Sequence, residues 1–182
     1  MSKTKNDIHA QQDGFEKFLT NVNAFWSGNR KTIYTVVAIL IVATVALLAI
    51  KDQKDRANTA GQDAFALAIA KNFNDPTLLT PELQQIVTDH KGTPYAGYAA
   101  FLVAQQKLSA NENEDALTWF ETCLETKKAG DFVYAEAFEG KGIALEALGR
   151  TDEAKAAYKK VLTLSEGAHR YAQVNLQLAL LA

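Results

Sequence analysis

The chain has 182 residues and a formal net charge of −2, with 19 Lys and Arg against 21 Asp and Glu. Binding to nucleic-acid phosphates requires a concentrated basic surface, and the sequence shows none, so no nucleic-acid partner is expected. The single Cys cannot form an intramolecular disulfide, so the fold has to be stabilised by packing.

Residues 1–31 are predicted to form a cytoplasmic N-terminal segment with a short amphipathic helix. Six apolar side chains recur there at helical spacing: Phe15, Phe18, Leu19, Val22, Phe25 and Trp26. This spacing places them on one helix face. Two interpretations stay open, namely a helix that lies on the membrane surface and also touches a partner, or aromatic residues that simply sit at the membrane interface.

Residues 32–50 contain no charged side chain and read TIYTVVAILIVATVALLAI. As a helix this stretch would be about 28 Å long, close to the thickness of the hydrocarbon core of a bilayer. A cleaved signal peptide has a shorter apolar region nearer the start, followed by a small-x-small site, and this stretch has neither. We therefore predict an uncleaved transmembrane helix in the lipid bilayer. Its membrane-anchor residues are Thr32, Ile33, Ile39, Leu40, Leu47, Leu48 and Ile50.

The charges that flank this stretch do not fix its orientation, because three basic residues precede it closely and three follow it. The short N-terminal segment is net positive, and long C-terminal domains translocate with little regard for flanking charge. We therefore expect a single-pass protein of a bacterial inner (plasma) membrane, with a cytoplasmic N-terminus and a periplasmic C-terminal domain. A domain that faces the cytosol remains the alternative.

The part that follows the span is rich in Ala, Leu, Gln, Lys and Glu, which predicts helices and no strand. Residues 55–73 are expected to continue the membrane helix into the aqueous phase. The next helix is predicted to begin with Thr80 as its N-cap and Pro81 in its first turn. Thr93 and Pro94 repeat this pattern at the start of the helix after it.

An internal repeat is the sharpest signal in the chain. Four pairs of residues share an offset of 38 positions: Ala104 and Gly142, Ala116 and Ala154, Phe120 and Tyr158, and Cys123 and Val161. The second unit also matches the spacing W-x2-L-G-x2-Y…A-x3-F through Phe138, Gly142, Leu145, Gly149, Ala154 and Tyr158. The sequence therefore resembles the tetratricopeptide repeat.

This resemblance implies an all-α fold, with one N-terminal transmembrane helix followed by a small tetratricopeptide-like helical-repeat solenoid over residues 51–182. Gly142 and Ala154 are small enough for two antiparallel helices to approach closely. Gly149 lets the chain reverse between those helices. Residues 165–182 supply a last helix, which is expected to cap the solenoid.

Helical-repeat solenoids bind partners on the concave surface formed by the first helix of each hairpin. Alignment of the two units places six residues toward this groove: Tyr98, Phe101, Gln105, Glu139, Ile143 and Glu146. Several of them could instead pack against neighbouring helices. The Lys, Arg and Asn clamp that related domains use for a C-terminal carboxylate does not occur at these places.

The sequence contains no pattern typical of an enzyme. It has no HExxH or CxxC motif, no glycine-rich phosphate loop after a strand, and only three scattered His residues. We therefore expect no catalytic residue, no metal site and no cofactor.

The order of the parts, together with residues 93–106 (TPYAGYAAFLVAQQ), is similar to the single-pass ancillary subunit of the bacterial SecYEG translocon. This resemblance implies three partners: the translocon, a membrane-anchored periplasmic chaperone and newly exported polypeptides. The alternative is a structural scaffold of a cell-envelope or division complex that forms homo-oligomers through its helices.

Overall fold

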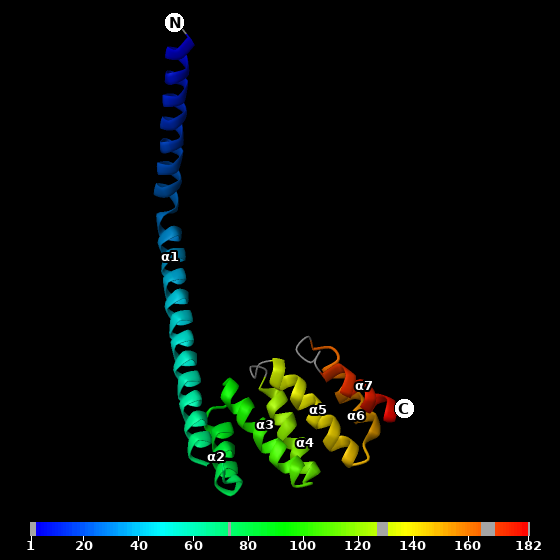
Figure 1. The fold of residues 1–182 in the computed structure, drawn as a ribbon. Helices are drawn as coiled ribbons and strands as arrows, with labels where there is room; N and C mark the ends of the chain where they lie inside the picture. The colour runs from blue at the N-terminus through cyan, green and yellow to red at the C-terminus, as the bar shows by residue number, and fades with distance from the viewer. Residues whose placement is uncertain (1–2, 73, 127–130, 165–169, 182) are drawn as a thin grey trace. The chain divides into compact units, whose positions relative to one another are not determined.

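The computed structural model describes residues 3–72, 74–126, 131–164 and 170–181, and every regular element in these ranges is a helix. The helices are α1 (Lys3–Asn72), α2 (Pro76–Asp89), α3 (Pro94–Ser109), α4 (Asn113–Glu125), α5 (Asp131–Ala147), α6 (Thr151–Val161) and α7 (Tyr171–Leu180) (Figure 1). The all-α prediction is confirmed. The chain divides into two compact units, Met1–Asp52 and Gln53–Ala182, and each is described by itself.

The first unit is a single run of helix α1. Its apolar side chains are open to the surroundings, as Leu40, Leu47 and Ile50 show with exposed fractions of 60%, 68% and 63%. Of the predicted anchor residues only Ile33 is partly covered. The hydroxyl groups of Thr35 and Thr44 donate to carbonyl oxygens four residues earlier, so these polar groups are satisfied within the helix. By length and composition, this helix is able to cross a membrane.

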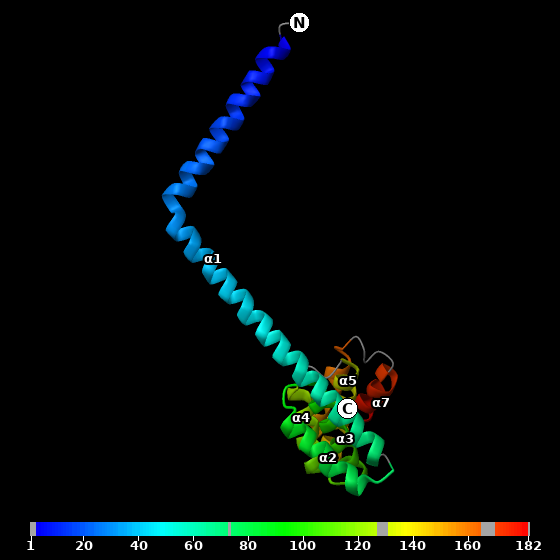
Figure 2. The ribbon, with the colours of Figure 1, turned by 90° about the vertical axis from the view of Figure 1, so that its left-hand side faces the viewer.

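The sequence predicted a short amphipathic helix before the span, and in the structure this stretch is part of one continuous helix over residues 3–72. No Pro occurs before position 76, so no residue of this stretch breaks the helix. Ser27 and Gly28 form the only Ser-Gly pair in the stretch, and such a pair can bend a helix without ending it. Figure 2 shows that α1 bends within its blue section. The predicted continuation through residues 55–73 is confirmed as far as Asn72.

The predicted start of α2 was wrong by more than one turn. The helix begins at Pro76, and its N-cap is Asp75, whose carboxylate accepts hydrogen bonds from the amide (3.0 Å) and the hydroxyl (2.5 Å) of Thr77. These hydrogen bonds, that from the hydroxyl above all, hold the pKa of Asp75 below its ordinary value. Pro81 therefore lies inside the helix, and the Thr80 hydroxyl contacts Gln106 of α3 instead of capping.

The start of α3 agrees with the prediction. Thr93 is its N-cap, buried with 3% exposure, and its hydroxyl oxygen accepts a hydrogen bond from the amide of Ala96 (3.3 Å). Pro94 occupies the first turn, where the missing N–H removes no helical hydrogen bond. The cap fixes the point at which the repeat hairpins begin.

Two helical hairpins, α3 with α4 and α5 with α6, form the main core of the second unit. All eight residues of the offset pairs are buried, including both aromatic members, Phe120 and Tyr158. A second cluster joins the end of α1 to α2 and α3, and its buried members are Ala68, Leu79, Leu83, Ile86, Ala99 and Val103. The internal repeat is therefore a repeat of structure as well as of sequence.

Two glycines of α5 contact buried aromatic rings, Gly142 that of Tyr158 and Gly140 that of Phe120. A Cβ atom at Gly142 would lie 2.5 Å from Tyr158 Cε1, and one at Gly140 would lie 2.2 Å from Phe120 Cζ. Only glycine allows contacts this close. Between α5 and α6, Gly149 has a φ of +73°, a conformation that favours glycine, which confirms its predicted role in the turn.

The thiol of Cys123 is fully buried in the core, and this burial raises its pKa to about 12. The folded state therefore binds a proton that the unfolded chain releases at lower pH. The contribution of Cys123 to the free energy of unfolding is fully present below the pKa of the unfolded chain, which is about 8.5. It is lost as the pH rises toward the pKa of the folded state, at up to about 1.4 kcal/mol per pH unit. Urea unfolding between pH of about 8 and 10.5 is expected to show a shallower loss of stability for Cys123→Ala than for the parent. Equal slopes would contradict this.

Candidate protein-binding surface

Helices α3 and α5 are the first helices of the two hairpins and carry all six predicted groove residues. On α3, the ring of Tyr98 is half-buried and belongs to an aromatic cluster. Its centroid lies 6.3 Å from that of Phe65 and 5.7 Å from that of Tyr95. Tyr98 thus helps to attach the end of α1 to α3.

The other two predicted residues of α3 differ in what they contact. The ring of Phe101 is half-buried and packs against the core, and its centroid lies 6.2 Å from that of Phe120. Gln105 lines a hollow of about 500 Å³ between α1, α2 and α3, in which Ile69, Leu79 and Leu102 provide the apolar surface. Phe101 is therefore a packing residue, whereas Gln105 borders open space.

On α5, Glu139 is almost fully buried with 4% exposure. Its Oε2 accepts a hydrogen bond from the guanidinium of Arg170 at 2.9 Å, and the Arg170 Nε lies 2.6 Å from Oε1 of Glu136, which is also buried. A single guanidinium just before α7 is thus shared by two carboxylates of α5. The sequence analysis missed Arg170, although Glu136 and Glu139, three residues apart on one helix face, were a signal for a shared cation.

The last two predicted residues lie one and two turns further along α5. Ile143 has 38% of its surface exposed, and Glu146 accepts a hydrogen bond from the Tyr158 hydroxyl at 3.0 Å. Burial, together with this hydrogen bond, raises the pKa of Tyr158 above its ordinary value. Of the predicted set, Gln105 and Ile143 present side chains to solvent, while Glu139 and Glu146 have partners within the domain.

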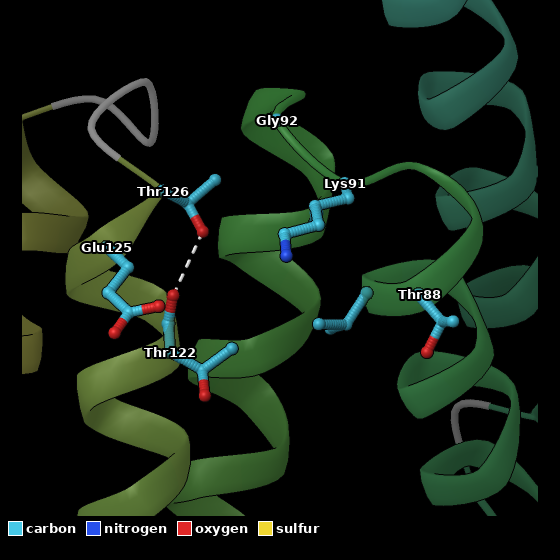
Figure 3. A pocket seen from close by; sticks show the side chains of 8 residues that line it. Thr88, Lys91, Gly92, Thr122, Glu125 and Thr126 are labelled. Atoms are coloured by element: carbon cyan, nitrogen blue, oxygen red, sulfur yellow. Dashed lines mark hydrogen bonds between the residues drawn. The ribbon is translucent and has the colours of Figure 1, made fainter.

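A second hollow, of about 400 Å³, lies where the connection between α2 and α3 faces the end of α4 (Figure 3). Lys91 projects into it from one side, and its lining also includes Glu125, three Thr residues and the small or apolar residues Val87, Gly92 and Ala96. The Thr126 hydroxyl donates to the carbonyl of Thr122 at 3.0 Å. Sequence reasoning missed this hollow because its walls come from two segments, residues 87–96 and 122–126, that are far apart in the sequence. Within the described ranges, no group of three or more His, Cys, Asp or Glu side chains could hold a metal ion.

Residues 23–133 match the family described as Tetratricopeptide repeat-like domain, which is more than half of the chain. The chain belongs to this family. The matched range holds the apolar stretch and the first hairpin, whereas most of α5 and all of α6 lie beyond it and carry the repeat spacing themselves. A tetratricopeptide-like fold indicates a protein-protein interaction module and is typically non-catalytic.

No curated protein matches the chain. Among solved structures, a TPR-like protein from Chlorobium tepidum TLS is similar to it. The two chains are 12% identical, the TM-score is 0.47, and the similar region covers 70% of this chain and 93% of the other.

Proposed function

We propose that this protein is a membrane-anchored, non-catalytic interaction module whose helical-repeat domain docks a protein partner. One observation supports the proposal: the same chain combines an apolar helix whose side chains are not buried with a domain of the tetratricopeptide repeat-like family. An apolar helix of a globular core would be covered by protein, and none of this apolar window is.

Anchoring makes weak contacts sufficient for docking. A domain confined to a membrane meets a partner in the same membrane at an effective concentration of the order of millimolar, so affinities too weak for free partners are adequate. The hollow beside Gln105 is lined by apolar and uncharged polar side chains, and Ile143 is an exposed apolar residue, so both places suit such transient docking.

The finer proposal is that the domain lies in the periplasm of a bacterial inner membrane and acts as an ancillary subunit of a SecYEG-type translocon. It would link the translocon to a membrane-anchored chaperone and to newly exported polypeptides. The sequence similarity of residues 93–106 and the order of the parts support this proposal.

In-cell crosslinking, followed by purification in mild detergent and mass spectrometry, tests it through the enrichment of translocon subunits. A reporter fused to the C-terminus tests the side of the membrane.

Ile143→Glu is expected to lower the recovery of crosslinked partner at least several-fold. The change places a charge on the accessible part of the proposed groove, and it should cost no more than about 2 kcal/mol of stability because Ile143 is only partly covered, at 38% exposure. Leu78→Glu is the matched control, since Leu78 is an exposed apolar residue of α2 and should leave recovery unchanged. Equal recovery from both variants would remove Ile143 from the binding surface.

A structural scaffold that self-associates is the second candidate function. It is favoured by α7, on which Leu176 and Leu180 are 59% and 71% exposed at a spacing of four residues, while Val174 is buried. Stable homo-oligomers in detergent that dissociate on Leu176→Glu would support the scaffold, and a monomer would exclude it.

A further inference from the structure

An exposed apolar face runs along α1 in the turns just before the predicted span. Five side chains form it, with exposed fractions between 46% and 66%: Phe18, Leu19, Val22, Phe25 and Trp26. At 100° per residue they occupy an arc of about 120° on the helix. The opposite side of the same turns carries Lys17, Thr20, Ala24 and Ser27.

The charge of this segment is of one sign. Residues 17–31 contain Lys17, Arg30 and Lys31 and no Asp or Glu. Basic residues beside an apolar helix face are attracted to anionic lipid headgroups, whereas a partner protein helix of mixed charge would gain nothing from this excess. The charge therefore favours a lipid surface as the occupant of the face.

The face is also continuous with the segment proposed to cross the bilayer. Trp26 on the face and Tyr34 within the span pack edge to face, with ring centroids 6.1 Å apart and an interplanar angle of 88°. Aromatic rings with a polar tip concentrate at the level of the headgroups, so this pair marks the boundary between surface and span.

The helix has to bend if it is to pass from the span onto the membrane surface. The sequence has a pair of residues that favours bending between the apolar face and the span. Ser-Gly pairs are common points of helix bending, and Ser27 and Gly28 lie between the face and the span. The Ser27 hydroxyl donates to the carbonyl of Ala24 at 3.1 Å, and nothing packs within 4 Å of a Cβ position at Gly28. The bend of α1 in Figure 2 falls in the same blue section of the helix.

We propose that residues 17–27 lie in the plane of an anionic membrane surface, with the face of Phe18, Leu19, Val22, Phe25 and Trp26 inserted among the lipids and the hinge at Ser27 and Gly28. This inference rests on the proposed anchoring through residues 32–50. It adds a second, peripheral contact between the chain and the bilayer.

The test uses the full-length protein, with Cys123→Ala, in vesicles of phosphatidylcholine with about one quarter phosphatidylglycerol. One nitroxide label is placed at a time through Phe18→Cys, Val22→Cys and Phe25→Cys on the face, and through Thr20→Cys and Ala24→Cys opposite it. Collision with oxygen, which concentrates in lipid, is compared with collision with a water-soluble nickel chelate. If Cys123→Ala does not fold, Cys123 is retained, because its buried thiol does not react.

The ratio of oxygen to nickel collisions is expected to be several-fold higher at the three face positions than at the two opposite ones. A label introduced by Ile41→Cys in the span reports on the anchor independently. Equal ratios at all five positions, with a high ratio at position 41, would overturn the surface helix and leave the anchor intact. A low ratio at position 41 would overturn both. Labels at 22 and 25 that are immobilised and shielded from both reagents would show a protein partner on the face, which also overturns the lipid assignment.

Discussion

Replacing Arg170 by methionine is expected to lower the free energy of unfolding by about 3 kcal/mol. The change leaves the buried carboxylates of Glu136 and Glu139 without the guanidinium that lies 2.6 Å and 2.9 Å from them. Breaking a buried ion pair from one side typically costs about 3 to 5 kcal/mol, and the 30% exposure of the Arg170 side chain places the effect at the lower end. Since Arg170 directly precedes α7, that helix should separate from the domain first.

Urea unfolding in detergent micelles measures this effect, with Trp119 as the only tryptophan after Trp26→Phe. The matched control removes all three charges through Glu136→Gln, Glu139→Gln and Arg170→Met. This neutral set should recover much of the lost stability, because the cost arises mainly from buried carboxylate charge that no longer faces the guanidinium. A loss below about 1 kcal/mol for Arg170→Met alone, as is typical of an exposed ion pair, would show that α7 is held by apolar packing instead.

Gly142→Leu is expected to abolish folding of the repeat domain. A single Cβ at this position already approaches Tyr158 Cε1 to 2.5 Å, and the Tyr158 ring is fully buried and hydrogen-bonded to Glu146. The smaller change Gly142→Ala should cost about 1 to 3 kcal/mol, which is typical of an overpacked core, and a leucine adds three further heavy atoms in the same space. Thermal melting followed by circular dichroism measures both variants.

Ala147→Leu, which adds the same three heavy atoms that separate Ala from Leu at 142 but on the exposed side of the same helix, is the control and should change stability by less than about 0.5 kcal/mol. A folded Gly142→Leu with the parental melting temperature would mean that the contact between α5 and α6 is looser than the distances indicate. Gly140→Ala should behave like Gly142→Ala, because the Cβ would lie 2.2 Å from Phe120.

The hairpin architecture could be predicted because its signals are local and repeated. Small residues such as Ala104 and Gly142 recur at one offset, and Thr93 followed by Pro94 marks a helix start without ambiguity. The start of α2 could not be chosen in the same way. Asp75 with Pro76 and Thr80 with Pro81 offer the same capping signature, and the choice depends partly on the contact of Thr80 with Gln106, which is 26 positions away.

The binding surface was less predictable than the fold. Repeat alignment places Glu139 on the groove side of α5, but it does not show that Arg170, 31 positions later, comes back to pair with it. Gly140 was missed for a related reason: the repeat pattern specifies the glycine that faces its own hairpin and not the one that faces the previous hairpin. Contacts between units are set by tertiary packing, which a pattern read within each unit does not contain.

The two glycines of α5, Gly140 and Gly142, constrain which substitutions each hairpin can accept. Phe120 comes from α4 and Tyr158 from α6, yet each closes on α5, at positions only two residues apart. A larger residue at 140 is tolerable only in a lineage in which position 120 has become smaller, and the same holds for 142 and 158. Descendants of this sequence should therefore change at these positions in matched pairs. A second hairpin transplanted from a relative should fold only if its residues at 142 and 158 match each other and its residue at 140 matches the residue at 120 of the first hairpin.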